Sequence, residues 1–418
     1  MIKFIHSADI HLDSPLQRLE AYEGAPVEEI RQASRRAFEN LVDLAIDEAV
    51  DFVLIVGDLF DGDWKDYNTG LYFIKQIKRL SETRIQVFIV SGNHDAAGKM
   101  TRTLPYPDNV HVLSSRKPET QIIEDLKVAV HGQSFAQVAI TDNLALDYPD
   151  PVPGHFNIGL LHTSLTGREG HENYAPCSLD DLTNKGYDYW ALGHVHQFER
   201  VAEDPPVVFP GCAQGRHIRE SGAKGCVLVT AEEGTPPEII RHDIDVIRWE
   251  RVPVDLDGVT RVDEIIERFL TIFENVIDRH DPKPVIARVE FSGETDVHDP
   301  IAADPEHLKN AIRSMAIAHF GDRAWIEKVI VRTRPKARSV ADPGPLRELS
   351  ALVDDLMSND PELLNIGKAL STLFQKLPPE YRQGDARLQP DDPEQLRELV
   401  AQAHALLVNS MKKETAAS

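Results

Sequence analysis

Short apolar runs alternate with amphipathic segments from the start of the chain to about residue 90. Residues 26–50 carry apolar side chains every three or four positions, which predicts a helix, and a second helix is expected at 69–80. The runs FVLIV and VFIV contain no polar residue, as is typical of strands buried in a parallel sheet. This alternation predicts a mainly parallel sheet covered by helices.

The chain becomes richer in strands between residues 110 and 231. VHVLS, LKVAVHGQSF, FNIGLLH, YWALGH, PVVFPG and GCVLVTA are short β-like runs separated by Pro, Gly and Asp turns. We interpret them as a second sheet packed on the first. The fold class expected for residues 1–245 is therefore α/β, a two-sheet αββα sandwich.

Two further regions are expected beyond the sandwich. Residues 246–335 alternate helices and strands and predict a small α/β domain, with elements at 261–277, 285–291, 305–320 and 325–332. Residues 336–418 begin with a polar linker and continue as a C-terminal helical region, with helices at 345–357, 362–374 and 393–411.

The last predicted helix has an apolar face that needs a partner surface. Its residues are Leu396, Leu399, Val400, Ala403, Leu406 and Leu407. The pattern fits packing against the chain's own domain and packing against another chain equally well, and both alternatives stay open here.

Composition narrows the class of protein. The chain has 418 residues, which suits two or three domains, and 42% of them are hydrophobic. No apolar run reaches the length of a membrane span, and the start MIKFIHSADIH fits a strand better than a signal peptide, so a cytoplasmic protein without a membrane segment is expected. The three cysteines have neither metal-binding spacing nor a paired framework.

The net charge of −23 argues against a surface that coats DNA, because phosphate binding normally uses clustered Lys and Arg. Basic clusters do occur, at Arg31/Arg35/Arg36, at Arg216/Arg219/Lys224 and at 332–338. Taken alone, each cluster is more typical of a solvated face than of a DNA contact.

Five apolar runs are followed at once by side chains that can bind a metal ion. A single histidine at a strand end is usually a structural residue, but an ordered set of five such turns is hard to obtain by chance. The candidate ligands are Asp9, His11, Asp58, Asn93, His162, His194 and His196. Because ligands sit at the carboxyl ends of strands in open α/β sheets, these turns predict one metal centre.

The motif order D-x-H, G-D, G-N-H-D, H, G-H-x-H resembles that of the calcineurin-like metallophosphoesterases. The words HLDSPL, GDLFDGDW and WALGHVHQ are similar to those of SbcD- and YhaO-type DNA-repair nuclease subunits, strongly over about the first 240 residues. The resemblance implies a metal-dependent phosphoesterase, and most specifically a DNA exonuclease or endonuclease of DNA repair.

The same resemblance implies partners. Residues 246–335 would cap the metal centre and help to select DNA, and the C-terminal helices of residues 336–418 would bind an SMC-like coiled-coil ATPase subunit. A homodimer is a further alternative that the sequence leaves open.

The resemblance also implies two ligand sets. One metal ion would be held by Asp9, His11, Asp58 and His196, and the other by Asp58, Asn93, His162 and His194. A shared carboxylate between two cations offsets their repulsion, and two divalent ions facing only two carboxylates leave a cationic centre. Mixed imidazole and oxygen ligands suit manganese, iron or zinc, and the resemblance favours two Mn²⁺ ions.

The candidate catalytic residues are His94, as a general acid, and Asp61, as the residue that orients it. SbcD-like enzymes usually carry a histidine three residues after the shared aspartate, where this chain has Asp61. Phosphatases of the superfamily carry an aspartate there, but they follow it with an arginine, where this chain has Gly62.

Two alternative functions therefore remain. One is a phosphodiesterase or phosphatase acting on nucleotides or other small phosphates. The other is a non-catalytic interaction scaffold, which the complete ligand set argues against, because a scaffold has no need to gather so many buried polar groups at one point.

Overall fold

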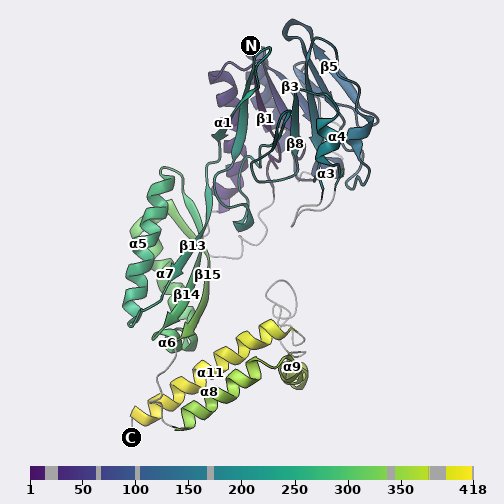
Figure 1. The fold of residues 1–418 in the computed structure, drawn as a ribbon. Coiled ribbons are helices and arrows are strands. Elements are labelled where there is room, and N and C mark those ends of the chain that lie inside the picture. The colour runs from purple at the N-terminus through teal and green to yellow at the C-terminus, as the bar shows by residue number, and fades with distance from the viewer. Residues whose placement is uncertain are drawn as a thin grey trace. The chain divides into compact units, whose positions relative to one another are not determined.

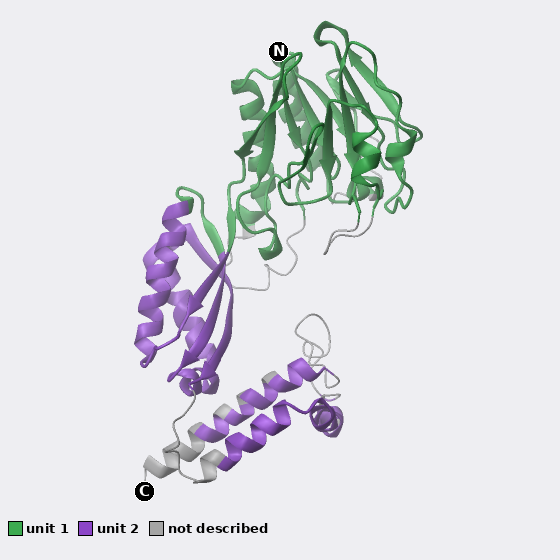
Figure 2. Cartoon of the chain, viewed as in Figure 1, with its two compact units in different colours: residues 1–250, 280–286 green, residues 251–279, 287–418 purple. Residues whose placement is uncertain are grey.

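The structure is a computed structural model, and it describes residues 1–14, 27–62, 67–98, 104–166, 174–336, 344–374, 376 and 392–416. Figure 1 shows the elements in chain order. Two compact units are present, one made of residues 1–250 with 280–286, and the other of residues 251–279 with 287–418 (Figure 2).

A six-stranded sheet forms one half of the first unit, in the order β12-β11-β1-β2-β3-β4. The four neighbours β1 to β4 run parallel, whereas β11 is antiparallel to β1 and β12 is antiparallel to β11. The strands are β1 (Ile2–Ser7), β2 (Phe52–Val56), β3 (Gln86–Val90), β4 (Val110–Val112), β11 (Gly225–Ala231) and β12 (Glu238–Asp243).

Two helices cover the outer face of this sheet, as the periodicity predicts. They are α1 (Val27–Asp47) and α2 (Asn68–Glu82). Phe38 of α1 and Phe73 of α2 stack with ring centroids 5.5 Å apart, in one buried cluster with alternate residues of β1, β2 and β3. The α1 side of the sheet lies away from β5 and β8 (Figure 1).

The second sheet has the order β5-β6-β7-β8-β10-β9. Its strands are β5 (Glu119–Ile123), β6 (Val128–Gly132), β7 (Phe156–His162), β8 (Tyr189–Gly193), β9 (Glu199–Glu203) and β10 (Pro206–Phe209). The four inner strands run parallel and the two outer strands antiparallel to their neighbours. The short helix α4 (Leu179–Thr183) contributes Leu182 to the cluster of Trp190 and Tyr187 on the outer face.

The assignment of every later strand to the second sheet is wrong for two of them. VHVLS contributes β4 and GCVLVTA forms β11, and both lie in the first sheet. Val227 and Val229 of β11 face the core between the sheets, whereas Cys226 and Leu228 pack in the cluster that contains α1 and α2. A strand buried on both faces has no alternation that tells one sheet from the other.

The two sheets pack face to face through apolar side chains of alternate residues. Phe4, Phe52 and Phe88 of the first sheet share a buried cluster with Ile158 and Tyr189 of the second. The buried His6 of β1 adds a polar link, because its two ring nitrogens lie 3.0 Å from Tyr189 Oη and 3.0 Å from Leu192 O. The predicted two-sheet α/β sandwich is confirmed.

The second unit is built around the three-stranded sheet β13-β14-β15. Its elements are β13 (Arg248–Asp255), α5 (Val262–His280), β14 (Val285–Thr295), α6 (His298–Ala303), α7 (Pro305–Phe320) and β15 (Ala324–Pro335). Phe273 of α5 meets Phe320 of α7 edge to face, with ring centroids 5.2 Å apart. The helix predicted at 305–320 is present with those bounds.

Three further helices follow, α8 (Gly344–Met357), α9 (Asp360–Phe374) and α11 (Pro393–Ala416). On α11, Leu396 and Val408 are buried, whereas Leu406 and Leu407 are 55% and 52% exposed. Part of the predicted apolar face is therefore uncovered in this chain. Among the described residues, no helix combines the length and the apolar character that crossing a membrane requires.

Candidate dinuclear metal centre

The seven predicted ligands follow five strands whose carboxyl ends meet at one edge of the sandwich. Asp9 and His11 follow β1, Asp58 follows β2, and Asn93 begins the short helix α3 (Asn93–Ala97) after β3. His162 is the last residue of β7, and His194 and His196 follow β8. Since β1, β2 and β3 are neighbours in one sheet and β7 and β8 in the other, the topology gathers these residues.

The backbone at several ligand positions is left-handed. The angle φ is 51° at Asp9, 48° at His11, 50° at Asp58 and 100° at His194. Non-glycine residues rarely adopt such values, which cost roughly 1–3 kcal/mol each when the residue is not suited to them. Hydrogen bonds hold the turns in place, from Asp9 N to Gly57 O at 3.0 Å and from His11 N to Asp58 O at 2.9 Å.

Gly92 allows the turn after β3 to approach the turn after β2. Its φ of −93° is open to any residue, so the requirement for glycine is steric. A Cβ atom at this position would lie 2.8 Å from Asp58 N and 2.8 Å from His162 Nε2, and closer still to Asp58 Oδ1. Any larger residue would therefore push apart two of the predicted ligands.

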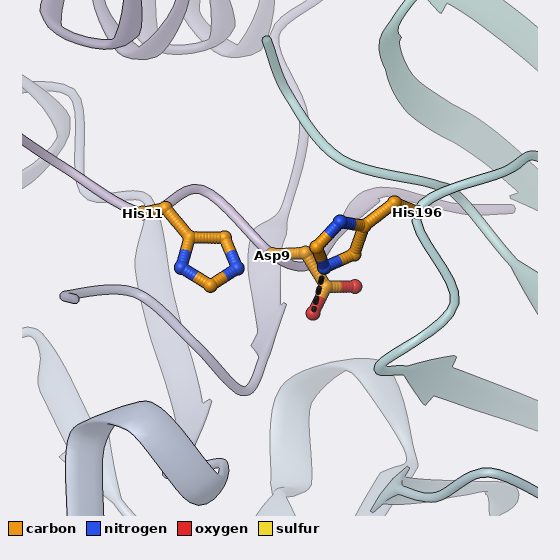
Figure 3. A group of neighbouring side chains, drawn as sticks. All are labelled: Asp9, His11 and His196. Carbon is orange, nitrogen blue, oxygen red and sulfur yellow. Dashed lines mark ion pairs between the residues drawn. The ribbon is translucent and has the colours of Figure 1, made fainter. Parts of the chain in front are cut away.

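Asp9, His11 and His196 form the first group of convergent side chains (Figure 3). Their ligand atoms lie within 4.8 Å of one another, with His196 Nε2 3.7 Å from Asp9 Oδ1. His196 Nδ1 lies 2.6 Å from Glu220 Oε1 and can donate a proton there, which leaves Nε2 as the nitrogen that faces Asp9.

His11 provides the clearest sign that this group fits a metal ion. Both of its ring nitrogens are buried and have no hydrogen-bond partner among the described residues. Buried polar atoms in proteins nearly always have a partner, so an imidazole of this kind fits a cation. Burial, and next the charge of Arg216, lowers the pKa of His11 to about 3, so the ring is neutral, as a metal ligand must be.

Asp9, Asp58 and His162 form a second group with ligand atoms within 4.8 Å. His162 Nδ1 donates to Val56 O at 3.1 Å, so Nε2 is the nitrogen that faces the centre. This Nε2 lies 3.1 Å from Asn93 Oδ1 and 3.5 Å from Asp58 Oδ2. Asn93 therefore lies at this group, as the sequence predicts.

His194 lies beside the second group. Its ring centroid is 5.2 Å from that of His162, and its backbone N–H donates to Asp9 Oδ2 at 2.9 Å. In the described part of the chain, its ring nitrogens belong to none of the His, Cys, Asp and Glu groups with ligand atoms within 4.8 Å. Its role as a ligand stays a prediction.

Asp58 lies between the two groups. Its Oδ2 is 3.8 Å from His11 Nε2 and 3.5 Å from His162 Nε2, and its Oδ1 accepts a hydrogen bond from His94 N at 2.9 Å. Burial tends to lower the pKa of His162, but the charge and hydrogen bond of Asp58 outweigh burial and raise it to about 9. Without a metal ion, the imidazole of His162 is therefore positively charged at neutral pH, with a proton on both ring nitrogens. A bound cation would replace the proton on Nε2.

His94 and Asp61 lie at the exposed rim of the site. The side chain of His94 is 43% exposed, and its Nδ1 contacts Asp61 Oδ1. This hydrogen bond is the main reason that the pKa of His94 is raised. Burial acts to raise the pKa of Asp61, but the imidazoles of His94, which it contacts, and of His11, whose Nδ1 lies 3.7 Å from Asp61 Oδ1, outweigh burial and hold that pKa below its usual range. Asp61 also accepts from Ser14 Oγ at 2.6 Å.

Several supporting residues were not identified from the sequence. Asp95 accepts hydrogen bonds from the backbone N–H groups of Leu59, Phe60 and Gly92 at 3.2, 2.9 and 3.0 Å, and so ties the turn after β2 to the turn after β3. The available signal was its place in G-N-H-D, three residues after the glycine, the spacing of a capped turn.

The interpretation of Arg216, Arg219 and Lys224 as a solvated face is wrong for two of the three residues. Lys224 is 3% exposed and donates from Nζ to His196 O at 3.0 Å. The Arg216 side chain is 18% exposed and pairs with the buried Glu220. Only Arg219 is exposed. A basic side chain that has a buried partner, whether four residues away as for Arg216 or 28 as for Lys224, looks the same in sequence as a solvated one.

Known proteins match both units. Residues 2–198 match the family model of the calcineurin-like phosphoesterases, and residues 249–334 match that of the middle domain of the metallophosphoesterase YhaO. The chain is 36% identical over 296 residues to the metallophosphoesterase YhaO of Bacillus subtilis. The aligned region covers 70% of this chain and 72% of the Bacillus protein.

More distant relatives are archaeal DNA double-strand break repair proteins Mre11. Identity is 27% over 262 residues with the protein of Sulfurisphaera tokodaii, covering 58% of this chain and 63% of that one. It is 27% over 232 residues with the protein of Saccharolobus solfataricus, covering 54% and 57%. The chain thus spans less than two thirds of these Mre11 proteins.

The chain belongs to the calcineurin-like metallophosphoesterases, a family of hydrolases that use divalent metal ions. Within this family it is a homologue of YhaO, and it carries the YhaO middle domain after the catalytic domain. The predicted family and enzyme class are confirmed. The groups of convergent side chains described above are able to hold metal ions.

Replacing Asp58 by Ala should lower the occupancy of both metal sites, because this carboxylate lies between the two groups. Replacing His196 by Ala should weaken mainly one site, by about tenfold or more. Titration with Mn²⁺ followed by calorimetry and elemental analysis would measure both affinities. The exposed Asp142→Ala is the matched control. One strong site in the unmodified protein, or unchanged binding in Asp58→Ala, would contradict a dinuclear centre.

Gly92→Ala should also weaken metal binding, by about tenfold or more, since the added methyl group displaces Asp58 and His162. Gly222→Ala is a suitable control, because a Cβ atom there meets nothing within 4 Å. Thermal unfolding of both variants would show that the fold survives. Normal metal affinity in Gly92→Ala would mean that the two ligands do not need this close approach.

Proposed function

We propose that this hydrolase is a dinuclear-metal-dependent phosphodiesterase whose substrate is DNA, cleaved as an exonuclease or endonuclease in repair. The observation that carries the proposal is the convergence of three imidazoles, those of His11, His162 and His196, with the carboxylates of Asp9 and Asp58, near the partly exposed His94. Similarity to the Mre11 repair proteins supports DNA as the substrate. The full ligand set would be Asp9, His11, Asp58, Asn93, His162, His194 and His196.

Two bound divalent cations, for which Mn²⁺ is the proposed identity, would polarise a phosphoryl oxygen and activate a water molecule for attack on phosphorus. The residues of the chain supply positioning and proton transfer. Asp61 holds His94 Nδ1, which leaves Nε2 at the exposed rim to meet the substrate. The raised pKa of His94 favours the protonated imidazole, the form that can donate a proton to the leaving oxygen.

A phosphodiesterase for nucleotides or other small phosphates is the second candidate. The net charge of −23 favours it, and so do the partners of two arginines that otherwise suit DNA. Arg35 makes a forked contact with Asp13, with Nε 2.6 Å from Oδ1 and Nη2 2.5 Å from Oδ2, and Arg216 is paired with Glu220. These two cations are already neutralised within the chain.

An SMC-like coiled-coil ATPase is the proposed protein partner, and the C-terminal helices are its proposed binding region. Exposed leucines on two neighbouring helices support this, Leu370 and Leu373 on α9 and Leu406 and Leu407 on α11. A second copy of the chain is the alternative occupant. The proposed compartment is the cytoplasm, where such a partner and DNA would both be present.

Linear DNA labelled at one end and bis-p-nitrophenyl phosphate should both be hydrolysed in the presence of Mn²⁺. Gel analysis of the DNA and absorbance of released nitrophenol would measure the two rates. Asp58→Ala protein, purified in the same way, tests for a contaminating nuclease and should act on neither substrate. Hydrolysis of the small diester with intact DNA at every enzyme concentration would favour the second candidate.

His94→Asn should keep both metal ions and reduce turnover of an unactivated diester by roughly a hundredfold, the usual size of a lost general acid. Asp61→Asn should lose less of this turnover. The turnover of the double variant should be hardly lower than that of His94→Asn, because Asp61 acts through His94. Since Asp61 raises the pKa of His94, His94 stays protonated to higher pH in the unmodified protein. The falling limb of the kcat profile should move to lower pH in Asp61→Asn.

The leaving group provides the control for this assignment. Nitrophenolate needs little protonation, so bis-p-nitrophenyl phosphate should be hydrolysed by both variants at nearly the normal rate. Fully additive losses, or an unchanged falling limb in Asp61→Asn, would show that the two residues act separately.

A further inference from the structure

A buried ion pair lies directly behind the proposed metal ligand His196. Glu220 is 4% exposed and ends the short turn Ile218–Glu220 between β10 and β11. Its Oε1 accepts from Arg216 Nη2 at 3.0 Å and from His196 Nδ1 at 2.6 Å, and its Oε2 accepts from Arg216 N at 2.7 Å. Glu220 therefore fixes both the His196 ring and the Arg216 side chain.

The other branch of the Arg216 guanidinium faces the rim of the site. Its Nη1 lies 3.4 Å from Ser14 Oγ and 3.9 Å from Asp61 Oδ2. Ser14 Oγ in turn donates to the same Asp61 oxygen, and the second oxygen of Asp61 contacts His94. A continuous series of polar contacts thus runs from His196 through Glu220 and Arg216 to Asp61 and His94.

We propose that Arg216 is a positioning residue, which holds the pair Asp61 and His94 in place relative to the metal ligand His196. The inference rests on the proposed phosphodiesterase function and identifies a further residue that this function requires. Glu220 anchors one branch of the guanidinium, and the other branch limits the rotation of the Asp61 carboxylate. A lysine cannot perform both tasks, because its single ammonium lacks the planar fork.

A purely structural role would be a weaker account of these contacts. The Nη2 group of Arg216 is enough to neutralise the buried Glu220, yet its Nη1 group lies beside Asp61. The residue after Asp61 is Gly62, which has no side chain that could supply a cation there. Arg216 provides that charge from a distant segment, and it does so from a fixed position because its side chain is mostly buried.

The position of Asp61 matters most when the leaving group needs a proton. Arg216→Gln should therefore retain both metal ions and hydrolyse bis-p-nitrophenyl phosphate within about threefold of the normal rate. Turnover of a thymidine dinucleotide, whose leaving group is an alkoxide, should fall by about tenfold or more. Arg219→Gln is the matched control, since Arg219 is exposed on the same segment, and it should match the unmodified protein on both substrates.

Three variants separate the two branches of the guanidinium. Arg216→Gln combined with Asp61→Asn should be hardly worse than the more damaged single variant, since both act on His94. The turnover of the dinucleotide by Arg216→Lys should be closer to that of Arg216→Gln than to that of the unmodified protein. Glu220→Gln should show the same substrate dependence and should also weaken metal binding by about ten- to hundredfold, because it alters the partner of His196.

A readout without turnover keeps this inference separate from the proposed function. In zinc-loaded protein with ¹⁵N-labelled histidine, Arg216→Gln should shift the ring signals of His94, whereas Arg219→Gln should not. Equal losses on both diesters, full activity in Arg216→Lys, or an unshifted His94 ring would overturn the inference. Failure to cleave DNA would count only against the proposed substrate. If Arg216→Gln does not fold, Arg216→Lys supports the same measurements.

Discussion

The site depends on one buried carboxylate, that of Asp58, held where the two sheets meet. It is 1% exposed, and burying a carboxylate is costly unless cations or hydrogen bonds compensate it. His11, His162 and the backbone N–H of His94 surround it, and Gly92 is required because its turn lies against this carboxylate. The same arrangement that compensates Asp58 also produces a group of ligand atoms for divalent cations.

The sandwich makes this arrangement possible because it holds the ends of five strands rigidly. Phe4 and Phe52 stack at 4.9 Å within the first sheet, and Phe4 meets Tyr189 of the second sheet edge to face at 5.5 Å. The core can then hold the following turns in left-handed conformations that an isolated chain would avoid. A site on rigid strand ends keeps its ligands close together even before a metal ion binds.

The sequence was most informative where chemistry and strand pattern lie in the same few residues. Each predicted ligand stands at the end of an apolar run, so the local pattern locates the turns that carry Asp9 and Asp58 and the strand end at His162. The helix at 305–320 has clear limits at Pro305 and Gly321. The sequence does not reveal the roles of Glu220 and Asp95, because their partners in the site, His196 for the first and the turn after β2 for the second, lie 24 or more residues away. The sequence predicts the wrong sheet for the strand at 225–231, because both faces of this strand are buried. Pairing across long separations leaves no local pattern in the sequence.

The acidic character of the chain also constrains how DNA would be held if it is the substrate. Arg35 and Arg216 are already paired with Asp13 and Glu220, so these members of the basic clusters offer little charge to a phosphate backbone. Affinity for long duplex DNA comes largely from many such contacts and the counterions that they release. A chain with a net charge of −23 would instead attract phosphates locally, at the proposed cationic metal centre. Such a site suits a DNA end or a single strand, which presents few phosphates, better than a continuous duplex, and it predicts a shallow dependence of binding on salt.

A partner subunit that contributes a basic surface would remove this constraint. The acidic charge of this chain and the proposed ATPase partner are therefore consistent with each other.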